Sequence, residues 1–227
     1  MPYILNRQRR VDRYNHHYTM NIYRGCSYGC KYCYATQPCA WNGLGERIQL
    51  LRNPEPKDDL IERLTMDLDK LEDLPDDEKD VQIGNTWDVY PPIEVRYELT
   101  RGVLDLFSEY PEWKVHLETK SPMITRDIDI IKEIPYFQAE ITITTLHHSH
   151  IFEPQAPDIL KRIEAIKKLS DNDLYVRIMI MPVLEGYTDI AEIWDYTSSF
   201  GAREFKSKRL NYFTNEDVER WVEEEQQ

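Results

Sequence analysis

The sequence lacks a long apolar run and contains few cysteines. No stretch of its 227 residues approaches the roughly 18 consecutive apolar residues that cross a bilayer. Met1–Arg10 carries charges where a signal peptide needs an apolar segment, so we expect a cytoplasmic protein with no membrane partner. Four cysteines, three of them clustered, do not make the framework of a disulfide-rich domain. A hydrophobic content of 41% is sufficient for one domain with a sizeable core.

Basic residues are also in deficit. The formal net charge of -13 and the pI near 4.9 argue against a surface that binds nucleic acid broadly by neutralising phosphates. The deficit is uneven, because residues 1–24 contain five arginines and one acidic residue, a local charge of +4. We interpret residues 1–17 as a solvated basic arm, with a grip on a phosphate-bearing substrate as the alternative, and residues 18–227 as the core domain.

Three of the cysteines lie in one short loop, with the spacing Cys26-x3-Cys30-x2-Cys33. Gly25 and Gly29 supply the backbone freedom that such a loop needs to turn its thiols toward one centre. A structural zinc site has four ligands, whereas an iron-sulfur cube held by three thiolates keeps one iron open. Cys39 follows closely enough to be a fourth ligand, so a closed zinc or electron-transfer site without catalysis remains the alternative.

Strand and helix patterns alternate along the rest of the chain. Leu60, Ile61, Leu64 and Leu68 fall at helical spacing, and the other helices are predicted in the same way. Strands and helices that alternate across short loops predict an α/β fold with a parallel sheet, whose site lies at the C-terminal ends of the strands. The predicted strands are Tyr18–Tyr23, Val81–Thr86, Lys114–Thr119, Ala139–Thr145, Leu174–Met181 and Glu204–Lys208, and the predicted helices Lys57–Leu74, Val95–Tyr110, Ile128–Ile134, Ile159–Leu169, Ile190–Phe200 and Asn215–Glu225, the last capped by Thr214.

The cysteine loop resembles the signature of the radical S-adenosylmethionine (radical SAM) superfamily, in the branch related to spore photoproduct lyase. The resemblance is carried by Tyr-Arg-Gly-Cys-Ser-Tyr-Gly-Cys-Lys-Tyr-Cys-Tyr-Ala, with Tyr32 before the last cysteine. It implies a partial (β/α)6 barrel that holds a [4Fe-4S] cluster on Cys26, Cys30 and Cys33. It also implies S-adenosyl-L-methionine (SAM) on the open iron, cleaved by one electron from an external reductant to give a 5'-deoxyadenosyl radical.

The remaining cofactor-binding candidates come partly from the resemblance, which covers Asn85, Thr86 and Lys120, and partly from the strand pattern. Thr142 and Thr144 share one face of an alternating strand, and plain β propensity is the alternative for them. Polar side chains at strand ends point into such a barrel, and Lys120 is a charge suited to a carboxylate. Arg177 lies in an apolar strand, where its charge needs an anion from SAM, the substrate or an internal carboxylate. Asp88 matches an aspartate of the family's segment, but a structural role, in which its carboxylate caps a turn by bonding nearby backbone, is equally expected. The candidates are Tyr32, Asn85, Thr86, Lys120, Thr142, Thr144 and Arg177.

The branch suggests a nucleobase substrate in a nucleotide or nucleic acid, single-stranded or flipped, because a local patch suffices for such a base. The cations Lys206, Lys208 and Arg209 near strand ends favour an anionic substrate. Spore photoproduct lyase has a hydrogen-donating cysteine near the end of the second strand, but the matching position is on or near Ile83. Membership of the branch is therefore expected without the lyase reaction itself. The histidines at 147, 148 and 150 are interpreted as a surface loop.

Overall fold

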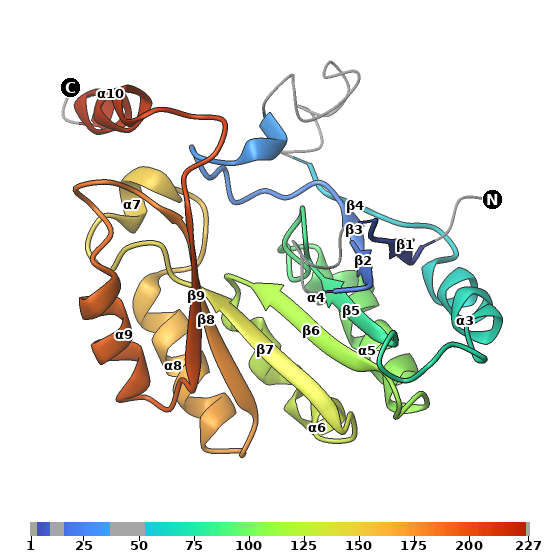
Figure 1. Ribbon diagram of the computed structural model, residues 1–227. Coiled ribbons are helices and arrows are strands. Elements are labelled where there is room, and N and C mark those ends of the chain that lie inside the picture. Colours follow the sequence, from blue (N-terminus) through green and yellow to red (C-terminus); the bar gives the residue numbers. More distant parts are fainter. Residues whose placement is uncertain (1–3, 10–15, 37–52, 226–227) are drawn as a thin grey trace.

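The core of the protein is a curved parallel sheet. The computed structural model describes residues 4–9, 16–36 and 53–225. The sheet has seven strands in the order β1-β2-β5-β6-β7-β8-β9, and its neighbours are parallel except for β1 and β2 (Figure 1). The strands are β1 (Asn6–Arg7), β2 (Tyr18–Met20), β5 (Asp80–Ile83), β6 (Lys114–Thr119), β7 (Tyr136–Thr142), β8 (Tyr175–Val183) and β9 (Glu204–Arg209). The predicted α/β fold with six parallel strands in chain order is confirmed.

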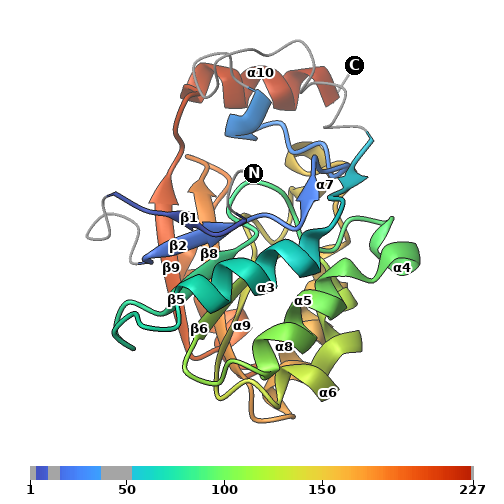
Figure 2. The same cartoon turned by 90° about the vertical axis from the view of Figure 1, so that its right-hand side faces the viewer.

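Helices cover the convex side of this sheet, and two further helices lie beyond the C-terminal ends of the strands (Figures 1 and 2). The predicted helix over 95–110 is divided in two, because Glu98 has a φ of 48°, which breaks the helical backbone. Among the described residues no helix is long and apolar enough to cross a membrane. The helices are α3 (Leu60–Lys70), α4 (Glu94–Tyr97), α5 (Leu99–Ser108), α6 (Ile128–Ile131), α7 (Ser149–Phe152), α8 (Ile159–Ser170), α9 (Ile190–Ser198) and α10 (Asn215–Glu225), with 3-10 helices η1 (Tyr34–Thr36) and η3 (Pro122–Asp127).

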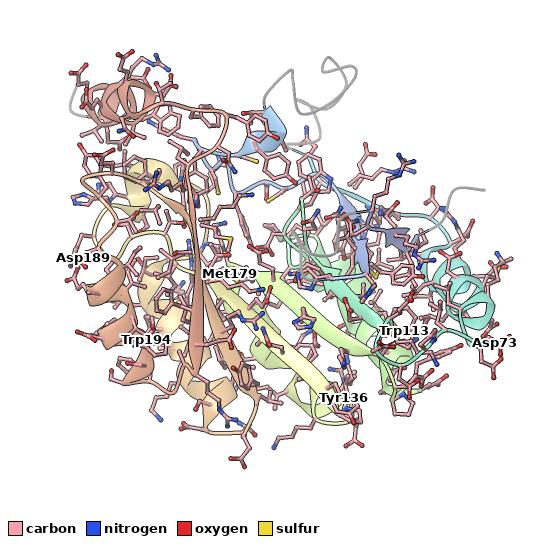
Figure 3. The ribbon with its side chains drawn as sticks, viewed as in Figure 1. Asp73, Trp113, Tyr136, Met179, Asp189 and Trp194 are labelled. Carbon is pink, nitrogen blue, oxygen red and sulfur yellow. The ribbon has the colours of Figure 1, made fainter. Side chains whose placement is uncertain are left out.

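Alternation along the strands separates an apolar face from a polar one. On β6, Val115 and Leu117 are fully buried in the main core, whereas His116 and Glu118 lie on the opposite face. Figure 3 shows Met179 of β8 on the concave side of the sheet and Trp194 of α9 on its convex side. The concave side of the sheet is therefore the polar interior of a partial barrel, and the convex side packs on the helices.

The first predicted strand is shorter than expected. The backbone leaves the sheet after β2, where the Asn21 side chain accepts hydrogen bonds from the backbone N–H groups of Thr86 and Trp87. Tyr23–Arg24 forms β3, which pairs antiparallel with β4 (Glu55–Pro56). The predicted loop over 37–45 and apolar segment over 48–51 lie outside the described residues.

Residues 4–9 differ from the solvated arm that the charge count indicated. Ile4 and Leu5 are buried in the main core, and their N–H groups donate to the Asp67 carboxylate of α3 at 2.6 and 3.2 Å. The following residues form β1 on the edge of β2. The charge count of the segment does not take account of these two apolar residues. The free energy gained by burying them outweighs the preference of the charged neighbours for solvent.

The floor of the barrel contains two histidines, of which His16 is buried and His116 partly buried. The His16 and His116 rings lie 5.0 Å apart, and the Nδ1 atom of each has no hydrogen-bond partner in the described part of the protein. Burial lowers the pKa of each ring to about 4, helped at His16 by the facing imidazole and at both rings by nearby cations. The carboxylate of Asp80 opposes both shifts and that of Glu140 opposes the shift of His16, but the desolvation is larger. The cations that face the pair are Lys114, Arg177 and Lys206.

We expect His116→Gln to flatten the loss of stability in acid. An imidazole that titrates near pH 4 when folded and near 6.5 when unfolded stabilises the fold fully above pH 6.5, and this stability is lost as the pH falls toward 4. The effect is up to about 3 kcal/mol for one ring, at about 1.4 kcal/mol per pKa unit. Urea unfolding of the metal-free protein at several pH values measures it. The control is His147→Gln, because His147 is exposed. If the free energy of unfolding fell equally with pH in both variants, the low pKa assigned to His116 would be contradicted.

Candidate cofactor site

A cavity of about 770 Å³ lies at the C-terminal ends of the strands, within the size range of small-molecule sites. The cysteine loop forms one wall, the ends of β5, β6 and β7 form another, and the end of β9 with the residues after it forms the exposed edge, or mouth. Its lining includes Cys26, Tyr28, Cys30, Lys31, Tyr32, Cys33, Tyr34, Asn85, Thr86, Asp88, Glu118, Lys120, Thr142, Met181, Lys208, Arg209 and Tyr212.

The cysteine loop is fixed by its own backbone and by its neighbours. Gly25 and Gly29 have φ values of 88° and 63°, a region that favours glycine. Inside the loop, the Cys33 N–H donates to the Cys30 carbonyl at 3.0 Å. Two bonds join the loop to the end of α7 and to the segment after it: Lys31 N–H to the Phe152 carbonyl at 2.9 Å, and Gln155 N–H to the Tyr28 carbonyl at 3.1 Å. The loop therefore presents its thiols from a defined position.

The donor set fits a thiolate-bound iron-sulfur group. Cys26, Cys30 and Cys33 are free thiols, each partly exposed and lining the same cavity. Burial raises the pKa of all three, that of Cys26 to about 11, so they are protonated without metal, and iron would displace their protons on binding. Among the described residues no three His, Cys, Asp or Glu side chains gather closely enough for a single metal ion. A four-iron cube takes each thiolate on a different iron, and Cys39 lies outside the described residues.

Five of the predicted SAM-binding residues line this cavity: Tyr32, Asn85, Thr86, Lys120 and Thr142. The Tyr34 hydroxyl donates to the Asn85 carbonyl at 3.2 Å and lies 3.1 Å from Thr86 Oγ1, which joins the β5 end to the cysteine loop. Lys120 Nζ lies 5.7 Å from the centre of the Tyr32 ring. The cavity thus places a lysine and several hydroxyl and amide groups opposite the three thiols.

The other two candidates lie elsewhere. Thr144 is fully buried outside the lining, and its hydroxyl is 3.1 Å from the Tyr32 hydroxyl. Arg177 lies deeper in the barrel, where it donates to Glu140 at 2.7 Å and also pairs with Glu204. Of the three anions considered for Arg177, the structure supplies the internal carboxylate. The sequence could not separate them, because the strand pattern does not show how deep in the barrel a residue lies.

Asp88 has the structural role that was one of its two expected roles: its carboxylate caps a turn. Its carboxylate accepts hydrogen bonds from the backbone N–H groups of Tyr90 and Lys120 and from the Thr119 hydroxyl, at 2.8 to 2.9 Å. The carboxylate therefore ties the segment after β5 to the end of β6 and holds the backbone of Lys120 in place.

His147, one of the three histidines expected on the surface, has an exposed side chain. Its ring contacts the Glu192 carboxylate, which is also exposed, at 2.9 Å.

Glu118 is a cavity residue that the sequence reading missed. Thr142 donates to it at 3.2 Å, and burial followed by the nearby Glu140 raises its pKa to about 7. A signal was available, because residues two apart on a strand share a face and Glu118 stands two before Lys120. The cavity therefore contains a carboxyl group that changes charge close to neutral pH.

A search against family models identifies the class of this chain. The Radical SAM superfamily model matches residues 20–196, so the chain belongs to the radical SAM superfamily. Among curated relatives, the protein MJ0683 of Methanocaldococcus jannaschii is 29% identical over 185 residues, which cover 81% of this chain and 66% of MJ0683. Rv2578c of Mycobacterium tuberculosis is 25% identical over 187 residues, which cover 78% of this chain and 53% of that protein.

Solved structures share the fold. A doubly substituted spore photoproduct lyase with bound AdoMet and dinucleoside spore photoproduct superposes with a TM-score of 0.71 at 15% identity, covering 92% of this chain and 61% of the other. SuiB of Streptococcus suis bound to the precursor peptide SuiA gives 0.61 at 15% identity, covering 96% and 48%. The predicted partial barrel of the radical SAM type is confirmed. The chain spans about half to two thirds of the length of these proteins.

We expect Glu118→Gln to stabilise the metal-free protein above neutral pH. A carboxyl with a folded pKa of about 7 and an ordinary value of 4.5 costs the fold stability as the pH rises from 4.5 through 7. An uncharged amide removes that cost, a gain of about 1 to 3 kcal/mol near pH 8 and little at pH 4.5. Chemical unfolding at both pH values measures the difference, with the exposed Glu192→Gln as control. A gain equal at both pH values would refute the titration of Glu118.

Proposed function

We propose that this protein is a radical SAM enzyme whose [4Fe-4S] cluster is held by Cys26, Cys30 and Cys33. When bound, the cluster and SAM supply a 5'-deoxyadenosyl radical that abstracts hydrogen from a substrate. The observation that carries the proposal is the cavity itself, where three thiols of one loop face Lys120 and the polar ends of the strands. An exposed cluster needs a reducing compartment and an external one-electron donor, which supports a cytoplasmic location.

The cavity residues suit the polar parts of SAM. Lys120 would pair with its carboxylate, because it follows the end of β6 and is partly buried, whereas Lys208 is exposed and the Lys31 ammonium is engaged by the Trp221 carbonyl. Asn85 and Thr86 would approach the amino group from the end of β5, and the Thr142 hydroxyl would meet the ribose or methionine part. Thr144 would act through the Tyr32 hydroxyl, which it contacts. Arg177 is engaged by two carboxylates and has no part in this proposal.

The substrate we propose is anionic, with a nucleobase in a nucleotide or nucleic acid as the first candidate. Lys208 and Arg209 line the mouth of the cavity, and neither forms an ion pair in the described part of the chain. On a protein of net charge -13, these two cations make the entrance locally positive, which favours the binding of an anion there. The spore photoproduct lyase structure holds a dinucleoside, and the SuiB structure holds a peptide, which is the second candidate class.

Anaerobic reconstitution tests the cluster. We expect about four irons per chain and a SAM-dependent change in the spin-resonance signal of the reduced protein, since a three-thiolate cube leaves one iron for SAM. Alanine at Cys26, Cys30 or Cys33 should abolish both results. Cys39→Ala is the matched control and should leave iron content and SAM cleavage intact. One tight zinc per chain, or loss of the cluster on removal of Cys39, would instead support the non-catalytic metal module.

Lys120→Met tests the SAM site. Loss of a charged hydrogen bond in an enclosed cavity costs about 1.5 to 3 kcal/mol, so we expect the Kd for SAM to rise about tenfold or more. Equilibrium dialysis against the reconstituted protein measures it. Lys208→Met changes a lysine of the same cavity at its exposed mouth and should alter the Kd by about twofold or less, since exposed charges contribute little. Equal effects of the two substitutions would exclude a carboxylate partner for Lys120.

A further inference from the structure

Behind the cysteine loop lies a buried ion pair that the proposed chemistry does not use. Glu153 and Arg162 are 3% and 1% exposed, and Arg162 Nη2 lies 2.5 Å from Glu153 Oε2. Neither residue lines the cavity. Removing two charges from water is costly, and such a pair stabilises little unless its remaining hydrogen-bonding groups are also satisfied. Its surroundings therefore decide what it contributes.

The other two nitrogens of Arg162 donate to the backbone of the sheet and of the segment just before α8. Nη1 donates to the Thr142 carbonyl at 3.1 Å, and Nε donates to the Pro157 carbonyl at 2.9 Å. Thr142 is the last residue of β7, and its side chain lines the cavity. The planar guanidinium thus fixes the position of Glu153 relative to the cavity wall.

Glu153 transmits this position to the cysteine loop. Its carboxylate accepts a hydrogen bond from the Tyr32 hydroxyl, and Tyr32 stands between Cys30 and Cys33 in sequence. The preceding residue of the loop, Lys31, donates its N–H to the Phe152 carbonyl, next to Glu153. A continuous set of buried contacts therefore runs from the end of β7 through Arg162 and Glu153 to the loop.

The pair also places charge beside the thiols. Burial alone would raise the pKa of Glu153, but Arg162 and Lys120 outweigh it and lower that pKa, so the carboxylate stays ionised. The electrostatic fields of Glu153 and Lys120 both reach Cys30, with opposite effects on its charge. A charge fixed in a dry region interacts strongly over such distances, because little water screens it.

We propose that Glu153 and Arg162 are positioning residues: they hold Tyr32 and the cysteine loop against the end of β7, and their charges set the reduction potential of the cluster bound there. The second part rests on the proposed function, whereas the first concerns the polypeptide alone. Reduction adds negative charge to a cluster, so a neighbouring carboxylate disfavours it and a neighbouring cation favours it.

The metal-free protein tests the positioning. We expect Arg162→Lys and Glu153→Gln to increase the alkylation rate of Cys30 and Cys33 about tenfold, measured by mass spectrometry of the peptides, because the loop loses its anchor. Glu94→Gln is the matched control, since Glu94 is a fully buried carboxylate that accepts from Tyr23 and pairs with Arg126 at 2.6 Å outside the cavity lining. Unchanged rates, or an equal increase in the control, would overturn the positioning role.

The reconstituted protein tests the electrostatic part. We expect the midpoint potential of the cluster, from a redox titration followed by spin resonance without SAM, to shift positive in Glu153→Gln. It should change little in Arg162→Lys, which keeps the charge, and in Glu94→Gln. An unshifted potential in Glu153→Gln would overturn this part.

The two proposals fail separately. Failure of the wild type to bind iron would count against the proposed function, while the alkylation rates would still decide the positioning role. If Glu153→Gln does not fold, Tyr32→Phe supplies the alkylation test, because it removes only the hydroxyl that joins the loop to Glu153 and Thr144.

Discussion

The parallel register of the sheet is the constraint on which the rest of the structure depends. It brings Glu118, Glu140, Arg177 and Glu204 into one row across four strands. Charges inside a barrel need partners, and Arg177 is accordingly taken by two neighbours in that row. The row reaches the cavity at Glu118, and the next residues on the same face of β6 and β7, Lys120 and Thr142, line it as well. Arg177 lies outside the lining and is held by its neighbours in the row, so the strand that carries a charge decides, together with its depth, whether the charge is structural or available to a ligand.

Much of the fold could be predicted because most elements have a simple periodicity. The strand at 114–119 and the helix at 215–225 were predicted with their observed bounds. The errors occur where a contact distant in sequence overrides the local pattern. Asn21 binds the backbone after β5 and turns the chain out of the sheet. Ile4 and Leu5 pack on the core although arginines follow them.

The site was predictable to the extent that it is local in sequence. The three cysteines and Lys120 were identified from short motifs and line one cavity. Arg162 was missed, although it interrupts the buried stripe that Ile159 and Ile166 form on α8. A charge on such a stripe indicates a buried partner, but the sequence does not identify Glu153 as that partner. Its identity depends on how the segment after α7 folds back over the strand ends, which no periodicity encodes.

The sheet ends in strands of unequal length. On one side β1 has two residues, and on the other β9 has six and is the last strand of the sheet in the described part of the protein. A long open strand invites pairing with another chain, and natural proteins discourage this with basic side chains along it. β9 contains Lys206, Lys208 and Arg209. The basic residues beside the cavity therefore also stand on the outer strand of the sheet, where side chains of this kind disfavour pairing with another chain.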